Sequence, residues 1–150
     1  MSIVGITASK DYLYLAMTTG PKAQFSVAQH HRIVVNPNDW LSLLATLTTH
    51  LSSYDSEDAI EHVAVACCAS GKYGASPEAF KAEGFAEVRC QERGYPISVV
   101  TKKGLAKHIG CPPAQKWQVF AKQLFNVQKQ ITYFTSGYDA AISAAYGVAP

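Results

Sequence analysis

Two groups of residues in this 150-residue chain have side chains that could bind an anion. The first is the pair Lys72 and Tyr73, which a glycine flanks on each side. The second is a stretch without any carboxylate that holds six lysines: Lys102, Lys103, Lys107, Lys116, Lys122 and Lys129. A lysine can meet a phosphate, and a tyrosine ring can stack on a base or a sugar. The sequence therefore predicts either a phosphate-binding surface or an ordinary solvated face.

The cysteines and histidines show no spacing that predicts a metal site. The four cysteines form no C-x-x-C pair and have no histidine at zinc-finger spacing, so reduced thiols are expected. A reactive thiol at Cys67 or Cys68 is the open alternative. His30 and His31 are neighbours on an expected strand and should point to opposite faces, so they cannot bind one metal together. No cofactor is expected.

The elements that must position these residues begin with three strands and then alternate between helix and strand. Apolar, β-branched and aromatic runs predict strands at 2–8, 11–18, 25–35, 63–68 and 97–100. A turn at Ser9 and Lys10 joins the first two strands, and an acidic loop is expected over 55–61. Helical spacing of apolar residues predicts helices from the Asn36 cap to about 51, then over 76–93, 102–109 and 114–127, with a last helix from near 136. The small residues of this last helix should let it press close to the sheet.

This order predicts an α/β fold with a mixed five-stranded sheet and helices on both faces. The first three strands should be antiparallel and the later ones parallel. We expect a single domain over 1–150, because no linker or repeat interrupts the chain. No apolar run approaches the length that crosses a membrane, and the start lacks a basic leader, so a cytoplasmic domain without a membrane partner is expected.

Several segments resemble the RuvC (Holliday-junction resolvase) branch of the ribonuclease H-like superfamily. SIVGITAS at 2–9 is similar to the family's first strand, residues 98–110 resemble the stretch that leads into a basic helix, and YDAAISAA at 138–145 resembles the final helix. The loop with Lys72 and Tyr73 is also similar to one in small uncharacterised bacterial proteins of this fold. The resemblance implies a single RNase H-like (RuvC-like) domain with three α/β/α layers.

Most positions of the family's four metal-binding carboxylates hold other residues in this chain. The resemblance places them at Thr7, at Cys67 or Cys68, at Ser136 and at Asp139. Magnesium prefers carboxylates and other hard oxygen ligands, and the two ions activate water and stabilise the leaving oxygen. Asp139 also fits a capping box with Ser136 at the start of the last helix. Magnesium and the nuclease activity are therefore not expected to carry over.

Three hypotheses for the function follow. The first is a catalytically degenerate domain that binds DNA, RNA or another phosphate-bearing ligand at the carboxyl edge of its sheet, close to Thr7, Lys72, Tyr73, Lys102, Lys103, Lys107 and Asp139. The second is a protein-interaction scaffold, most simply a homodimer, which the small residues of the last helix and the aromatic residues Tyr133, Phe134 and Tyr146 favour. The third is an enzyme that uses the thiol of Cys67 or Cys68.

Overall fold

The computed structural model describes residues 1–67, 76–126 and 137–150. The strands are β1 (Ser2–Ala8), β2 (Tyr12–Thr19), β3 (Ser26–Val34), β4 (Ile60–Cys67) and β5 (Ile97–Thr101). The helices are α1 (Trp40–Glu57), α2 (Pro77–Glu92), α3 (Leu105–His108), α4 (Trp117–Asn126) and α5 (Tyr138–Val148), with short 3-10 turns η1 (Lys22–Gln24) and η2 (Lys102–Gly104).

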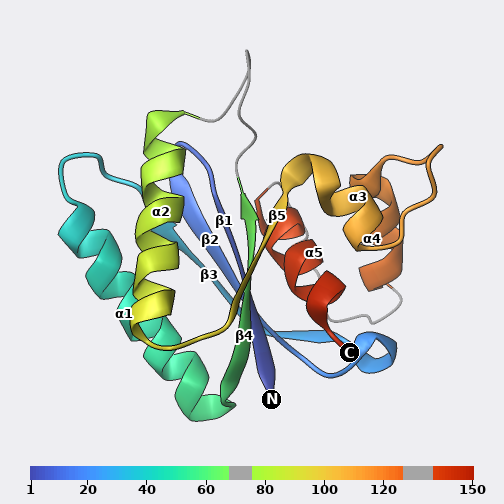
Figure 1. Cartoon of the computed structure of the whole chain (residues 1–150), viewed down its shortest axis with the longest axis horizontal. Helices are drawn as coiled ribbons and strands as arrows, with labels where there is room; N and C mark the ends of the chain where they lie inside the picture. Colours follow the sequence, from blue (N-terminus) through green and yellow to red (C-terminus); the bar gives the residue numbers. More distant parts are fainter. Residues whose placement is uncertain (68–75, 127–136) are drawn as a thin grey trace.

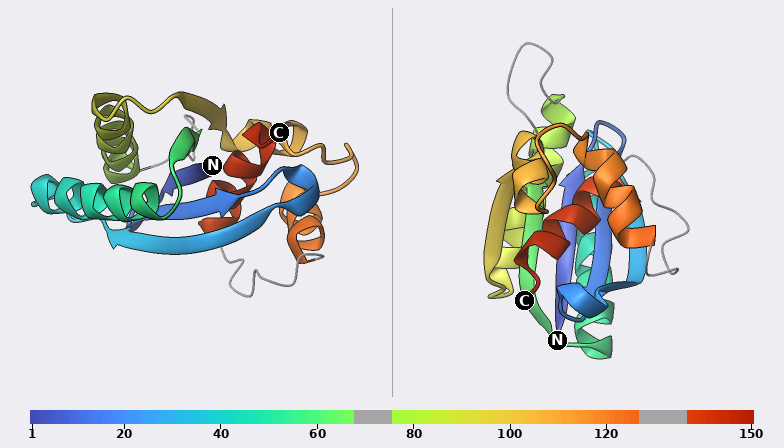
Figure 2. Two further views of the ribbon diagram at one scale, coloured as in Figure 1. Left: turned by 90° about the horizontal axis from the view of Figure 1, so that it is seen from below. Right: turned by 90° about the vertical axis from the view of Figure 1, so that its right-hand side faces the viewer.

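These elements form three layers (Figure 1). The strands make one mixed sheet in the order β3-β2-β1-β4-β5. Strand β2 pairs antiparallel with β1 and β3, while β4 pairs parallel with β1 and β5 pairs parallel with β4. Helices α1 and α2 cover one face, and α3, α4 and α5 lie on the other, as Figure 2 shows. The predicted α/β class, mixed sheet and helices on both faces are confirmed.

Strand β1 lies at the centre of the sheet, and all of its residues are buried. Val4 and Ile6 point into the core under α1 and α2, which we call the α1-side core. Ile3 points into the core under α3, α4 and α5, which we call the α5-side core. Because both faces of β1 are covered, its sequence is a nearly continuous apolar run instead of an alternating one.

Helix α5 packs unusually close to the sheet. A Cβ atom on Gly5 of β1 would stand only 1.8 Å from the carbonyl oxygen of Ala141, so no other side chain fits there. The helix residues that face the sheet are small and buried: Ala140, Ala141, Ala144 and Ala145. Small residues let two backbones approach, as the sequence predicted for this helix.

Strand β3 changes the face that its apolar residues cover. The register shifts opposite Met17 and Thr18 and leaves Ala28 as an extra residue, which is a β-bulge. Apolar residues before the bulge lie in the α5-side core and those after it lie in the α1-side core: Phe25 and Val27, then Ile33 and Val35. The edge strand therefore contributes to both cores.

The predicted start of the first helix is wrong by a few residues. Helix α1 begins at Trp40, and its N-cap is Asp39, whose carboxylate accepts a hydrogen bond from the Ser42 amide at 3.0 Å. The predicted cap, Asn36, instead accepts from the Asn38 amide at 3.0 Å. Asn36 therefore stabilises the turn before the helix.

The acidic loop predicted over 55–61 does not form. Helix α1 continues to Glu57 and β4 already begins at Ile60, where the Asp55 carboxylate accepts from the Ile60 amide at 2.8 Å. Asp55 thus links the last turns of α1 to the start of β4. The β1–β2 hairpin loop runs from Ser9 to Asp11, one residue longer than predicted.

His30 and His31 point to opposite faces of β3, as predicted. On the α1 side, Nδ1 of His31 lies 2.5 Å from the hydroxyl of Tyr54, and the His31 ring stacks on His50 with centroids 4.1 Å apart. On the α5 side, the His30 ring meets Tyr138 edge-on at 5.0 Å. The two histidines therefore take part in two separate packing clusters.

The histidine cluster on the α1 side predicts a loss of stability in acid. Burial lowers the pKa of His31, and burial together with the neighbouring His31 lowers the pKa of His50. A histidine whose pKa is lowered by folding leaves the fold most stable above the unfolded pKa of about 6.5. Below that pH, the unfolded chain binds more protons than the folded one, and the fold loses stability. We expect the free energy of unfolding to fall as the pH drops below about 6.5.

Urea unfolding at about pH 7.5 and about pH 5 measures this loss. The His50→Gln variant lacks one of the two stacked rings and should show a smaller difference between the two conditions. An equal or larger difference in the variant would contradict the assignment of the acid sensitivity to this pair.

Candidate functional site

The carboxyl ends of the parallel strands β1, β4 and β5 meet at one end of the sheet, which we call the carboxyl edge. The register places Thr7 near the end of β1 and pairs Cys67 with Thr101. Helix α5 begins at the same edge, because Tyr14 pairs with Thr7 and the Tyr14 ring lies against Gly137. Ligands of open α/β sheets bind at such an edge, so it is the candidate site.

Thr7 lies at this edge and is fully buried. Its hydroxyl donates a hydrogen bond to the carbonyl oxygen of Ala66 on β4 at 2.9 Å. The bond links the two central parallel strands just before they end. The side chain at this family position therefore holds the sheet together and does not face a ligand.

Cys67 is partly exposed at the end of β4. Burial raises the pKa of its thiol, and Glu83 and Glu87 of α2 raise it further, while Lys102 acts in the opposite direction. The nucleophile in thiol chemistry is the thiolate, which this environment disfavours. The geometry therefore gives no support to the thiol-enzyme hypothesis for Cys67, and Cys68 lies outside the described residues.

Asp139 caps the start of α5. Its Oδ1 accepts hydrogen bonds from the amides of Gly137 at 3.0 Å and Ala140 at 2.7 Å. Burial raises the pKa of Asp139, against the opposing effects of these two amides and of Lys102. The N-cap is Gly137, with a φ of 106°, and not the predicted Ser136, because this left-handed backbone favours glycine. Ser136 itself lies outside the described residues.

Lys102 lies near enough to both Cys67 and Asp139 to affect the pKa of each side chain. It directly follows Thr101, the last residue of β5, whose hydroxyl accepts from the Gly104 amide at 3.0 Å and so fixes the turn. The half-buried Lys102 opposes the rise of the pKa at both Cys67 and Asp139. Its ammonium group therefore acts on the ends of β4 and α5 at once.

The structure describes two of the other lysines that were predicted for the site, Lys103 and Lys107. Lys103 and Lys107 are exposed on η2 and α3, one and five residues after Lys102. Lys72 and Tyr73 lie outside the described residues. The structure thus brings Lys102 together with two of the family positions, and it places Lys103 and Lys107 on the adjoining surface.

The described residues at this edge do not fit a two-magnesium site. Thr7 donates its hydroxyl proton to the backbone, and Cys67 offers a sulfur atom that magnesium binds poorly. Among the described family positions Asp139 alone keeps a carboxylate, and one of its oxygens already accepts from two amides. Within residues 1–67, 76–126 and 137–150, no three His, Cys, Asp or Glu side chains gather closely enough to hold a metal ion. We derive no step through magnesium.

The sequence analysis missed a group of rings beside the carboxyl edge. Tyr12 and Tyr14 of β2 lie 5.9 Å apart between ring centroids, and Tyr138 of α5 meets Tyr14 at 5.0 Å. The guanidinium of Arg32 on β3 lies 4.3 Å from the centroid of Tyr12. We call Tyr12, Tyr14, Tyr138 and Arg32 the tyrosine face. The available signal was the alternation Tyr-Leu-Tyr-Leu, which puts both tyrosines of β2 on one side of a strand.

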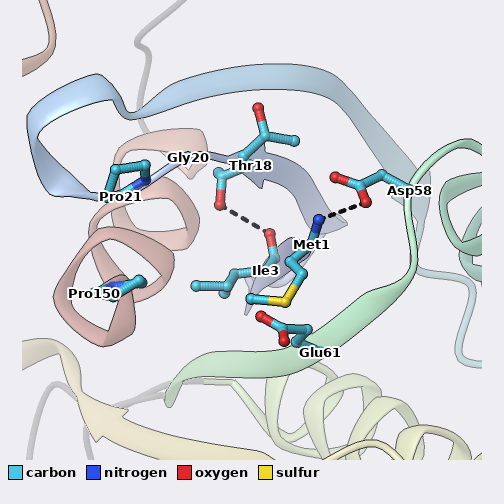
Figure 3. A pocket seen from close by; sticks show the side chains of 9 residues that line it. Met1, Ile3, Thr18, Gly20, Pro21, Asp58, Glu61 and Pro150 are labelled. Carbon is cyan, nitrogen blue, oxygen red and sulfur yellow. Dashed lines mark hydrogen bonds and ion pairs between the residues drawn. The ribbon is translucent and has the colours of Figure 1, made fainter.

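A separate pocket of about 300 Å³ lies at the opposite end of the sheet (Figure 3). Ile3 and Thr18 line it, and the Thr18 hydroxyl donates to the Ile3 carbonyl oxygen at 2.9 Å. The Met1 ammonium pairs with Asp58 at 2.6 Å beside it. The pocket contains none of the predicted site residues and is not part of the carboxyl edge.

Comparison with solved structures identifies the architecture. Thermus thermophilus RuvC is 16% identical to this chain and matches it with a TM-score of 0.70, over 98% of this chain and 92% of RuvC. The fold is that of RuvC. T. thermophilus RuvC in complex with a Holliday junction substrate gives 13% identity and a TM-score of 0.68, over 98% of this chain and 91% of the other. The resemblance stated from the sequence is confirmed at the level of the fold.

A second type of protein shares part of this RuvC-like fold. The PPX-GPPA enzyme of Aquifex aeolicus is 15% identical, with a TM-score of 0.53 over 83% of this chain and 41% of that one. No protein-family model and no curated protein sequence matches the chain. In the part of the chain that the structure describes, no helix has the length and apolar character to cross a membrane.

Proposed function

We propose that this RuvC-like domain binds nucleic acid or another phosphate-bearing ligand at its carboxyl edge and does not cleave it by two-metal chemistry. The observation that carries the proposal is the position of Lys102, which directly follows β5 at the carboxyl edge, with Lys103 and Lys107 exposed after it. Its ammonium group also acts electrostatically on Cys67 and Asp139, two positions at which the resemblance places carboxylates. The edge is therefore suited to attract phosphates instead of metal ions.

Two further observations support this proposal. Lys103 and Lys107 are exposed beside Lys102, so their ammonium groups are free to meet successive phosphates. A protein of the same fold, T. thermophilus RuvC, has been solved with a Holliday junction substrate. The donor set of this chain argues against a shared reaction, so the proposal extends to binding alone.

The homodimer hypothesis loses two of the features that favoured it. The small residues of α5 are buried against the sheet and are not available to a second copy. Tyr146 is also partly buried, with its ring 5.1 Å from that of Phe25, and is not the exposed aromatic that the sequence suggested. Tyr133 and Phe134 lie outside the described residues. Among the residues that the structure describes, no observation therefore favours the scaffold as a second function.

The test measures binding by fluorescence anisotropy of labelled DNA duplexes, at low and moderate salt. We expect the double charge reversal Lys102→Glu with Lys103→Glu to weaken binding about 10-fold or more at low salt. The loss of two phosphate contacts should also lower the dependence of log K on log salt by about two.

The matched control reverses two cations at the other end of the sheet, Lys22→Glu with Arg93→Glu. Lys22 lies on η1, next to the carbonyl of Pro150, and Arg93 ends α2 just before β5 begins. Both double variants change the net charge equally, so a general field effect would weaken binding equally in both. Equal losses, or no binding of the labelled DNA by the unmodified protein, would overturn the proposal of a nucleic-acid site at this edge.

A further inference from the structure

The tyrosine face lies on the same end of the sheet as Lys102. Strand β2 runs antiparallel to β1, so β2 begins where β1 ends, and Tyr14 pairs with Thr7. Strand β3 ends there too, because Arg32 pairs with Tyr14. Residues from β2, β3 and α5 that are far apart in the sequence thus share one surface beside the carboxyl edge.

The side chains of this surface are partly open to solvent. Arg32 is exposed, and Tyr12, Tyr14 and Tyr138 are each half-buried. Val34 pairs with Tyr12 on the same side of the sheet and keeps 67% of its surface exposed. Burial raises the pKa of Tyr138 and Arg32 lowers it, so the guanidinium also acts on this third ring. The surface therefore combines aromatic rings with a cation.

The rings and the cations are spread across the width of the sheet, so an extended ligand could contact all of them. Arg32 lies on β3 and Lys102 directly follows β5, and four strand spacings of about 4.8 Å, or about 19 Å in total, separate these two strands. Cations at both ends can hold backbone phosphates, and tyrosine rings between them can stack on bases. In a duplex the faces of the bases are stacked on one another, so unpaired nucleotides alone can use such rings.

We propose that the tyrosine face binds a stretch of unpaired nucleotides that continues into the lysines after β5. This inference rests on the proposed function and names its ligand class more narrowly, as nucleic acid with a single-stranded segment. Tyr12 stacks on a base, Arg32 meets the adjacent phosphate, and Lys102 holds the strand at the far end. Tyr14 packs beside Tyr12, and Tyr138 packs edge-on against Tyr14.

The test compares a labelled single-stranded DNA of about 12 nucleotides, a length within the usual site size of single-strand binders, with a blunt duplex of about 12 base pairs made from two strands. We expect Tyr12→Ala to weaken binding of the single strand about 10-fold and that of the duplex less than about 2-fold, because stacking on one ring contributes this much per base. Tyr12→Phe keeps the ring and should bind the single strand almost as well as the unmodified protein.

Arg32→Ala provides a second variant, which removes an exposed cation and leaves the three tyrosine rings in the protein. It should weaken single-strand binding several-fold, and more at low salt than at moderate salt. Thermal unfolding of each variant confirms that it is folded before binding is measured.

The outcomes separate this inference from the proposed function. If Tyr12→Ala and Arg32→Ala leave single-strand binding unchanged while the lysine double variant weakens it, the inference fails and the proposed function stands. Equal weakening of single strand and duplex by Tyr12→Ala also overturns the inference. If the unmodified protein binds neither ligand, both fail.

Discussion

Gly5→Ala is expected to lower the free energy of unfolding by about 3 kcal/mol, or the melting temperature by about 10 °C. The new Cβ would stand 1.8 Å from the carbonyl oxygen of Ala141. The obstacle is backbone in a packed helix and not the end of a flexible side chain. The whole of α5 must therefore move away from β1, which opens the α5-side core.

Gly84→Ala is the matched control for this substitution. Gly84 lies within α2, and a Cβ there meets no atom within 4 Å. Alanine has a higher helix propensity than glycine, so this variant should gain about 0.5–1 kcal/mol. Urea unfolding of both variants checks the pair. A Gly5→Ala protein as stable as the unmodified one would show that α5 does not pack on β1 as described.

Gly137→Ala is expected to cost about 3 kcal/mol for two separate reasons. The backbone at Gly137 has a φ of 106°, which residues with a Cβ rarely adopt. In addition, the new Cβ would stand 2.4 Å from the Tyr14 ring. Because the Gly137 amide also donates to Asp139, the start of α5 at the carboxyl edge should shift with it.

Gly94→Ala isolates the backbone part of this effect. Gly94 has a similar positive φ of 80°, but no atom lies within 4 Å of its Cβ position. It should lose only about 1 kcal/mol. In a Tyr14→Ala background, Gly137→Ala should also lose only its backbone cost, which a double-mutant cycle by urea unfolding measures. Equal losses for Gly137→Ala in both backgrounds would contradict the contact with the ring.

The central part of the fold was predictable because its sequence is unambiguous. Residues 2–8 and 63–68 are apolar runs too short for helices, as expected for strands buried on both faces. The small residues from Ala140 to Ala145 predicted a helix pressed against the sheet, and Gly5 supplies the matching gap in β1. Local pattern and tertiary packing agree in these elements.

Other features could not be predicted from local patterns. Asn36 and Asp39 are both good helix caps, and the choice between them depends on Trp40, which packs against the α1-side core. The alternation from Phe25 to Val35 predicts one buried face, and nothing in it marks Ala28 as the bulge that divides the strand between two cores. Such choices are made by the packing of distant elements.

The candidate site was predictable in part for the same reason. The order of the strands was enough to bring Thr7, Cys67, Lys102 and Asp139 to one edge. It was not enough to find the tyrosine face, because its rings come together only when β2 and α5 are placed in space. The capping role predicted for Asp139 is also observed, although its partner is the amide of Gly137.

The bulge at Ala28 has a consequence for how the sheet opens. An edge strand usually frays first, since it has one hydrogen-bonded neighbour and one face to release. In β3 the residues on either side of the bulge are held by different layers of the molecule. Detaching the strand thus exposes apolar surface in both layers at once, which ties the local opening of this edge to the cooperative unfolding of the whole domain.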